Sequence, residues 1–354
     1  MAGGRLLLYG GAMERDLAAL LADAEWLPHR VVGGSVRFVR LPVAERACLP
    51  FLDERFVGEN LPSAEVPLAR LAGREPAAEG GCHFIFHSAF CGSTLLARAL
   101  GSAGGATVLQ EPRALADLAA ALPAAGRSGE ARQAIDTVLA FLQRPGRPGE
   151  TAIIKPSNFA NPLIGDLLDL RPESKALLIY SRLPDFLLTI ARRGKANRPW
   201  ARRMATLFRR HPQFDPAEAV DLLLLTDLQA AAWVWLQHQA QFSRLLAEQP
   251  EGRIATLERG AFLADPARAL TGAAALFGLD LDEAGAAALA AGPVFRHHSM
   301  RPDRPFDPAT LKREEAAARF AYGAEIETAA EWAAELAGRA GVPLTLGSPV
   351  HPRD

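Results

Sequence analysis

The sequence has few cysteines, almost no net charge and no long apolar run. Its three cysteines, Cys48, Cys82 and Cys91, are too few for a disulfide framework, and the low, odd count is typical of a reducing compartment. No apolar run approaches the roughly 20 residues of a membrane span, and the first residues show no signal-peptide pattern. Lys and Arg total 39 and Asp and Glu total 40, which excludes a uniformly basic coat for nucleic acid. We therefore expect a cytoplasmic protein without a membrane span.

The composition is that of a globular protein with more than one part. Hydrophobic residues make up 49% and charged residues 22% of the 354 residues, which excludes a disordered chain. Residues 1–80 contain a short helical pattern at 16–25 and an alternating strand pattern at 35–41, but no chemical motif. We expect 1–80 to be an N-terminal extension or small cap, joined by a linker at 73–81 to a larger α/β domain over 81–345.

From residue 82 onward, strand patterns alternate with helical patterns. Short apolar segments predict five strands, at 82–87, 106–110, 151–155, 175–181 and 253–257. Apolar strands separated by helices are typical of a parallel sheet that is covered on both faces. The sequence therefore predicts a three-layer α/β/α fold with a central parallel sheet, followed by a mostly helical C-terminal part.

The segment at 83–100 carries the strongest functional signal. A buried strand there enters a tight turn, and Gly92, Ser93 and Thr94 open the next helix, so backbone N–H groups and the helix dipole point at one spot. Such a spot binds an anion, most often phosphate, although a plain Ser/Thr helix cap has the same pattern. Ser93 occupies the position of the P-loop lysine, and no acidic magnesium ligand follows the fourth strand. Both departures disfavour a magnesium-dependent kinase.

Two segments together resemble the P-loop sulfotransferase superfamily, in particular its bacterial sulfotransferase-like branch. The stretch HFIFHSAFCGSTLLARAL, at 83–100, resembles the loop that binds the 5′-phosphate of 3′-phosphoadenosine 5′-phosphosulfate (PAPS), the sulfuryl donor of that family. The stretch SRLPDFLLT, at 181–189, is similar to the family's 3′-phosphate motif, with Arg182, Asp185 and Thr189 in its positions. An arginine at a strand end also faces the ligand crevice of an open α/β sheet on general grounds, although an Arg–Asp helix cap has the same spacing.

Later segments follow in the order that the family shows. The strand at 253–257 is followed by an acidic residue and an Asp-Pro helix start, and VFRHHS at 294–299 resembles the basic loop that closes over the donor in many members. The likeness extends over about 82–340. It implies a P-loop-type sheet, PAPS as co-substrate without a metal, and transfer of a sulfuryl group to a hydroxyl or amine of a small-molecule or glycan acceptor.

The resemblance also implies the residues of the site. The 5′-phosphate would lie against the loop residues Ser88, Ala89, Phe90, Cys91, Gly92, Ser93 and Thr94. Arg182, Thr189 and Arg296 would hold the 3′-phosphate. Glu111 would deprotonate the acceptor, and Lys155 would stabilise the charge on the transferring group. From the residues alone, Glu111 could equally begin a helix and Lys155 could be a solvated lysine at a strand end.

Two positions depart from the family. Phe90 stands where most relatives carry Lys or Arg, so a weakly active or inactive nucleotide-binding protein of the same fold is one alternative, and a P-loop kinase is another. Ser157 stands where the cytosolic branch has its catalytic histidine, which favours Glu111 as the base. His87 is a further candidate base, and the adjacent histidines His297 and His298 are a poor metal signal.

One stretch of the chain is strongly basic. No acidic residue occurs between Asp185 and Asp215. The basic residues there are Arg192, Arg193, Lys195, Arg198, Arg202, Arg203, Arg209 and Arg210. Such a run is ordinarily a solvated face, but here it follows the 3′-phosphate motif and could steer an anionic donor or acceptor. Only Trp200 and Phe208 offer stacking within it, which disfavours nucleic acid as a partner.

Overall fold

The centre of the molecule is a five-stranded sheet in which all strands are parallel. The computed structural model describes residues 5–7, 13–74, 76, 81–121, 129–194, 198–211 and 220–350. The strands, in spatial order, are β6 (Ala106–Gln110), β7 (Thr151–Lys155), β5 (Cys82–His87), β8 (Ala176–Tyr180) and β9 (Ile254–Glu258). The predicted parallel sheet is confirmed, and each of its five predicted strands is found within one residue of the predicted bounds.

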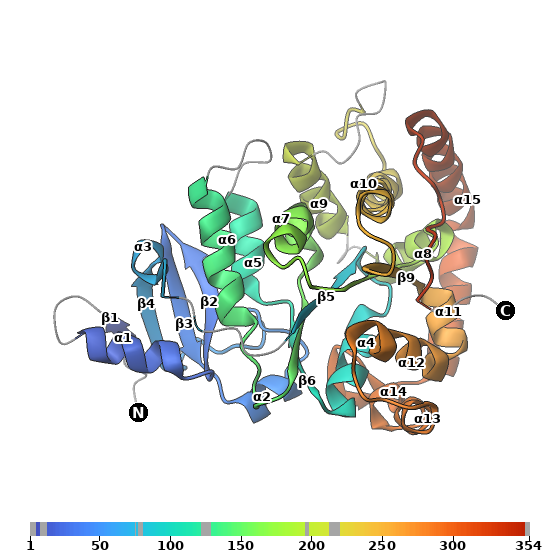
Figure 1. Ribbon diagram of the computed structural model, residues 1–354. Coiled ribbons are helices and arrows are strands. Elements are labelled where there is room, and N and C mark those ends of the chain that lie inside the picture. The colour runs from blue at the N-terminus through green and yellow to red at the C-terminus, as the bar shows by residue number, and fades with distance from the viewer. Residues whose placement is uncertain are drawn as a thin grey trace.

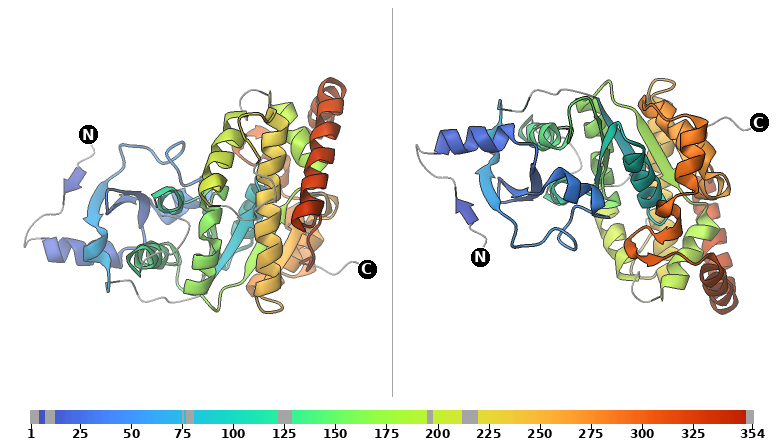
Figure 2. Two further views of the ribbon diagram at one scale, coloured as in Figure 1. Left: turned by 90° about the horizontal axis from the view of Figure 1, so that it is seen from above. Right: turned by 90° about the horizontal axis from the view of Figure 1, so that it is seen from below.

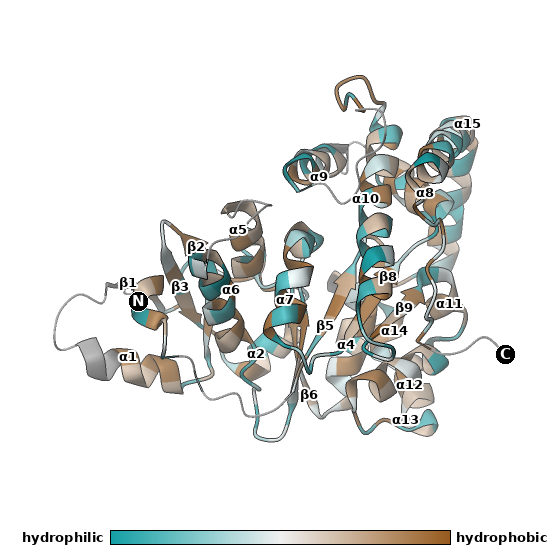
Figure 3. Ribbon diagram, turned by 45° about the horizontal axis from the view of Figure 1, so that its top comes forward, coloured by the Kyte–Doolittle hydropathy of each residue, from teal (hydrophilic) through white to brown (hydrophobic). Residues whose placement is uncertain are grey.

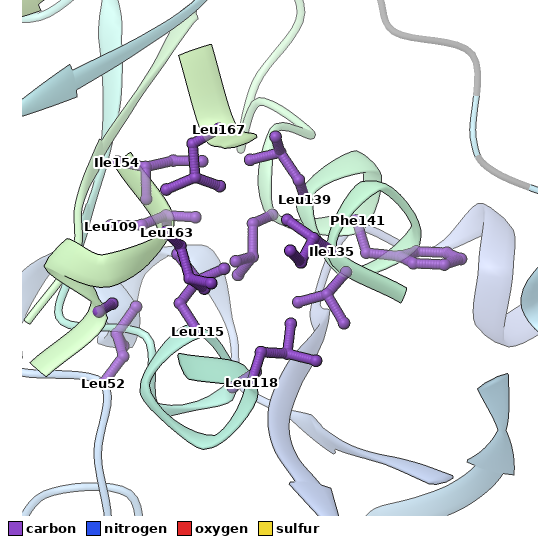
Figure 4. Packing of buried hydrophobic residues seen from close by; sticks show 14 of the residues in the cluster. Leu52, Leu109, Leu115, Leu118, Ile135, Leu139, Phe141, Ile154, Leu163 and Leu167 are labelled. Carbon is purple, nitrogen blue, oxygen red and sulfur yellow. The ribbon is translucent and has the colours of Figure 1, made fainter. Parts of the chain in front are cut away.

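Alternate side chains of β5 enter separate hydrophobic cores on the two faces of the sheet, as the two-residue period of a strand requires. Phe84 and Phe86 belong to the core that Figure 4 shows, whereas Ile85 belongs to the opposite one. The first core is covered by α5 (Arg113–Ala121), α6 (Gly129–Leu142), the 3-10 helix η1 (Asn158–Leu163) and α7 (Ile164–Leu170). The second is covered by α4 (Ser93–Ala103), α11 (Arg259–Ala264), α12 (Pro266–Phe277) and α13 (Glu283–Ala290). Figure 1 shows this three-layer arrangement, which confirms the predicted fold class.

A third core is purely helical. It joins α8 (Leu183–Arg193), α9 (Arg198–Arg210), α10 (Asp227–Glu248) and α15 (Pro308–Ala340). The two long helices, α10 and α15, run side by side in Figure 2 and pack against each other. Thr226 and Gln229 form a capping box that fixes where α10 begins. None of the described helices combines the length and the apolarity that a membrane crossing requires.

The predicted helical region of 266–340 is interrupted once. After α13 the chain forms the short helix α14 (Pro293–Arg296) and an antiparallel pair of strands, β10 (His297–His298) and β11 (Arg301–Pro305). The break falls where the sequence has prolines at 302 and 305, and a proline inside a helix removes a backbone donor.

The N-terminal part forms a second sheet, with the order β1-β4-β3-β2. Its elements are β1 (Arg5–Leu7), α1 (Met13–Ala22), β2 (Trp26–Val32), β3 (Ser35–Arg40), α2 (Val43–Cys48), β4 (Ser63–Pro67) and α3 (Leu68–Leu71). The sequence predicted only the first helix and β3. It missed β2 because Pro28 and a register shift between Pro28 and Arg30 disturb its alternation.

The N-terminal sheet packs onto helices of the central fold. Phe38 of β3 meets Phe141 of α6 edge-on, with ring centroids 5.3 Å apart, and both lie in the core that Phe84 shares. Arg144 donates to the carbonyl of Leu21 at 2.9 Å, which ties the end of α6 to α1. The hydrophobic core therefore continues from one sheet to the other without a break. Most of the predicted linker, at 75 and 77–80, lies outside the described residues.

Candidate active site

The site predicted from the sequence lies where the direction of strand order changes. From β5 the chain places β7 and β6 on one side and β8 and β9 on the other. In open parallel sheets the carboxyl end of the strand at such a point opens into a crevice where ligands bind. Residues 88–92 follow β5 at this position, and α4 begins at Ser93.

The loop at 88–92 has an unusual backbone. Ala89, Phe90 and Gly92 have φ values of 71°, 52° and 87°, in the left-handed region. Only glycine enters this region freely, and another residue held there costs about 1–3 kcal/mol. Among the described residues, the other non-glycine positions of this kind are Glu111 and Ser348. Of these four non-glycine residues, Ala89 and Phe90 lie in the loop, and Glu111 lies 3.8 Å from the His87 ring that holds Ala89. The loop and Glu111 are therefore the candidates for a functional site.

Hydrogen bonds from β8, from the residue after it and from η1 hold the loop in this shape. The N–H of Ser88 donates to the carbonyl of Ile179 in β8 at 3.0 Å. On the other side, the Asn161 amide donates to the carbonyl of His87 at 3.1 Å. The Ser181 hydroxyl lies 3.5 Å from the carbonyl of Phe90, at the limit of a hydrogen bond. The loop is thus anchored at its ends, while the first N–H groups of α4 have no partner within that helix.

The Ser88 hydroxyl indicates whether a phosphate fits this loop, because it is buried beside the start of α4. Ser88 is 1% exposed, and its Oγ has no hydrogen-bond partner among the described residues. A buried hydroxyl without a partner costs about 1–3 kcal/mol, so native structures rarely keep one unless a ligand or water completes it. A hydroxyl donor beside the N-terminal turn of α4 suits a phosphate oxygen, and these residues therefore fit the 5′-phosphate that the sequence predicts.

The His87 side chain holds the loop through a hydrogen bond to the backbone of Ala89. Burial lowers its pKa well below the usual 6.5, and the charges of Lys155 and His238 lower it further. The ring is therefore neutral, and its Nδ1 accepts the N–H of Ala89 at 3.2 Å, which assigns the ring proton to Nε2. That Nε2 lies 3.8 Å from Glu111 Oε1. In this arrangement His87 positions the loop, since its accepting nitrogen is already occupied.

Glu111 and Lys155 lie together at the ends of neighbouring strands. The Lys155 ammonium donates to Glu111 Oε1 at 2.7 Å, and the Glu111 N–H donates to the carbonyl of Lys155 at 2.6 Å. The Lys155 side chain is fully buried, and 14% of the Glu111 side chain is exposed. Lys155 is therefore not a solvated lysine at a strand end. The structure brings the two predicted catalytic residues into one ion pair. His87 lies between this pair and the loop, 3.8 Å from Glu111 and hydrogen-bonded to Ala89.

The N-terminal part adds two residues that sequence reasoning missed. Arg55 Nη2 lies 3.7 Å from Glu111 Oε2, and the Lys155 ammonium lies 5.6 Å from the centre of the Phe51 ring. Asp53 holds Arg55, whose Nε donates to both carboxylate oxygens at 3.0 and 2.8 Å. The segment at 51–56 has no motif that could have indicated this contact, because it arises from the docking of the N-terminal sheet beside β6.

The residues predicted for the 3′-phosphate follow β8 or lie on α14. Arg182 precedes α8 with 59% of its side chain exposed, and its Nε lies 3.8 Å from Glu258 Oε2. The Thr189 hydroxyl donates to the carbonyl of Asp185 at 2.9 Å, so it would have to rotate before donating to a phosphate. Arg296 is exposed at the end of α14. Among the described residues, no hydrogen bond or ion pair joins Arg182, Thr189 and Arg296, and their shared role stays a prediction.

The loop that carries Arg296 lies beside α4. Arg98 of α4 donates to the carbonyl of Ser299 at 3.2 Å, which ties this loop to the helix that begins at the phosphate loop. The ring of His297 bonds the carbonyl of Pro293 at 2.9 Å. In the part of the chain that the structure describes, no group of three or more His, Cys, Asp or Glu side chains could hold a metal ion.

The basic stretch between Asp185 and Asp215 divides into residues with different surroundings. Arg192 pairs with Glu314 at 2.6 Å, and Arg202 donates to the carbonyls of Leu222 and Leu225, both at 2.6 Å. These two arginines hold helices together. The exposed residues on α9, which is largely hydrophilic in Figure 3, include Arg203, Arg209 and Arg210. Lys195 and the side chain of Arg198 lie outside the described residues.

Comparison with known proteins gives matches among solved structures. No family model and no curated protein matches the chain. The sulfotransferase domain from the curacin biosynthetic pathway matches with 14% identity and a TM-score of 0.44, covering 75% of this chain and 99% of its own. A sulfotransferase from Alicyclobacillus acidocaldarius matches with 16% identity and a TM-score of 0.36, covering 65% and 98%. One from Mycobacterium tuberculosis matches with 12% identity and a TM-score of 0.38, covering 63% and 76%.

These identities are low and the TM-scores lie below 0.5.

Proposed function

We propose that the protein transfers a sulfuryl group from PAPS to a hydroxyl or amine of a small-molecule or glycan acceptor. The observation that carries this proposal is the position of the buried Glu111–Lys155 pair, at 2.7 Å, next to a strained loop that has a free hydroxyl and lacks the Walker lysine. An anion cradle beside a carboxylate and an ammonium supplies what sulfuryl transfer needs: a held donor, a base and a positive charge.

The donor would be held at two places. The Ser88 and Ala89 amides already donate to Ile179 and His87, so the later amides of the 88–94 loop and the Ser88 hydroxyl suit its 5′-phosphate. Arg182, at the end of β8, would bind the 3′-phosphate together with Thr189 and Arg296, and an arginine fork can bind a phosphate through two parallel hydrogen bonds. Arg182 is supported by its exposure and by its weak 3.8 Å pairing with Glu258, which leaves the guanidinium able to take another partner.

The chain's own groups would perform the proton transfer. When bound, the donor supplies the sulfuryl group: its bond to the bridging phosphate oxygen breaks, a bond from sulfur to the acceptor oxygen or nitrogen forms, and adenosine 3′,5′-bisphosphate leaves. Glu111 takes the proton of the acceptor. Lys155 holds Glu111 Oε1 at 2.7 Å, while Oε2 is 3.7 Å from Arg55, outside direct hydrogen-bond distance, and so remains able to receive the proton. General-base catalysis of this kind contributes about 100- to 10,000-fold.

A second candidate function is nucleotide binding without transfer. It is favoured by Phe90, whose ring packs against Phe186 and Trp200 and brings no charge to the loop. Both functions predict binding of adenosine 3′,5′-bisphosphate, whereas only the first predicts release of sulfate from the donor to an acceptor. A P-loop kinase would instead show magnesium-dependent turnover of ATP.

Calorimetry and a transfer assay separate these functions. We expect micromolar binding of the bisphosphate, and transfer from radiolabelled PAPS to at least one member of a panel of phenols, alcohols, amines and glycans. Glu111→Gln should lower the transfer rate at least 100-fold, and Glu54→Gln, at a half-exposed carboxylate nearby, should leave it unchanged. No binding of the bisphosphate at high micromolar concentration would exclude both the transferase and the nucleotide-binding protein.

A further inference from the structure

Arg193, the last residue of α8, places a positive charge on the phosphate loop. Its guanidinium carbon lies 4.8 Å from the centre of the Phe90 ring, at the distance of a cation–π contact. Phe90 itself is a loop residue, with a φ of 52°. The position that would carry a basic side chain in most sulfotransferases is therefore covered by the guanidinium of another residue.

The ring under this guanidinium is held in place. Trp200 meets Phe90 edge-on at 4.9 Å between ring centroids, and Phe186 packs against it at 6.1 Å. These two side chains come from α9 and α8, so three separate segments meet at the Phe90 ring. A planar guanidinium on a fixed aromatic platform is pre-organised, and less conformational freedom is lost when it binds an anion.

The Arg193 guanidinium has no neutralising partner within the described part of the chain. Among the described residues no carboxylate pairs with it, although its neighbour Arg192 pairs with Glu314 at 2.6 Å. Burial lowers the pKa of the Arg193 guanidinium, and the positive charges of Arg192 and Arg259 lower it further. A desolvated cation among like charges destabilises a protein unless an anion compensates it. Arg259 directly follows β9, at the same edge of the sheet as the phosphate loop.

We infer that Arg193 binds an oxyanion of the sulfuryl donor, a phosphate or sulfate group, at the phosphate loop in place of the basic residue that Phe90 replaces. The inference rests on the proposed function and adds a donor-binding residue that the sequence motifs do not contain. Phe90 then serves as the platform that positions the guanidinium. An alternative is that Arg193 is only a brace that stabilises the packing of Phe90.

Removal of the charge separates these roles. Arg193→Met keeps an apolar stem over Phe90 and removes the cation; Arg193→Gln is a second removal, and Arg203→Met removes an exposed charge from the same basic stretch as a control. We expect both Arg193 variants to bind adenosine 3′,5′-bisphosphate at least about 10-fold more weakly in calorimetry, the effect of losing one charged hydrogen bond. Arg203→Met should change the affinity less than twofold. The unfolding midpoint of ligand-free Arg193→Met should equal or exceed that of the wild type, because an uncompensated cation is gone.

The outcomes are distinguishable. If either Arg193 variant folds and binds the bisphosphate as tightly as the wild type does, the inference is wrong and the proposed function stands. A lower midpoint for ligand-free Arg193→Met with unchanged affinity would show a brace. If the wild type itself does not bind the bisphosphate, the proposed function fails, and inorganic pyrophosphate then decides the inference. A pyrophosphate-induced rise in the midpoint that is present in the wild type and absent in the Arg193 variants would support it; no rise in the wild type would overturn it.

Discussion

The Glu111–Lys155 pair allows stability and catalysis to be separated by a double-mutant cycle. At 2.7 Å and an effective dielectric constant of 20, two unit charges attract with about 6 kcal/mol. Desolvation of the fully buried Lys155 offsets most of this attraction, so the intact pair adds little net stability. Removal of only one partner should destabilise the protein, because the remaining charge is then buried without a partner.

We expect each single variant to be less stable than its contacts alone suggest. Glu111→Met leaves the buried ammonium alone and should cost about 4 kcal/mol, within the range for broken buried pairs. Lys155→Met should cost about 3 kcal/mol, the lower end of that range, since Arg55 remains 3.7 Å from the carboxylate. The double variant removes both charges, so its cost should fall about 2–3 kcal/mol short of the sum of the two single costs.

Urea unfolding of the four proteins at pH 7.5 measures this coupling, and the transfer assay runs beside it. The double variant should regain stability relative to the sum and remain inactive, which would separate the structural role of the pair from its chemical role. If the two single costs add up to the double cost within about 0.5 kcal/mol, the two side chains do not interact and the reasoning is refuted.

The remaining predictions concern the phosphate contacts and the loss of folding stability at acidic pH. Arg182→Ala should lower the affinity for the bisphosphate about 10- to 100-fold in calorimetry, because a charge-assisted bond to phosphate is lost. An unchanged affinity would show that Arg182 does not bind the donor. Thr189→Val should lower the affinity less than Arg182→Ala does, since the hydroxyl is already committed to a helix carbonyl. Burial lowers the pKa of His238 from 6.5 to about 4, so as the pH falls below 6.5 the unfolded chain binds the proton first and stability declines down to about pH 4. His238→Phe should therefore reduce the loss of unfolding free energy between pH 7 and pH 5 by about 2 kcal/mol, and an equal loss in both proteins would contradict the assignment.

The central sheet could be predicted because its signals are local. The apolar strands and the glycine turn before Ser93 depend on neighbouring residues, and their pattern survives in the sequence. The proximity of Glu111 and Lys155 also follows from the pattern, because the carboxyl ends of parallel strands share one edge of the sheet; their catalytic roles stay a prediction. Their direct pairing, however, depends on the register of β6 with β7, which places Gln110 opposite Lys155.

The rest of the site could not be predicted because it arises from packing between distant segments. Arg55 reaches Glu111 only after the N-terminal sheet docks, and nothing in the sequence around it indicates that partner. Arg193 looked like one cation in a basic run. Its role depends on the ring beneath it and on the carboxylates that its neighbours engage, and neither is visible without coordinates.

The continuous core between the two sheets also has a consequence for how the chain is made. The N-terminal sheet is synthesised first, but Phe38 packs against Phe141, which leaves the ribosome about 100 residues later, roughly 5–20 s at typical rates of synthesis. During that interval the β3 residues of this core lack the partners that α6 supplies. The N-terminal sheet therefore reaches its final packing only after the helix that carries Phe141 has been made.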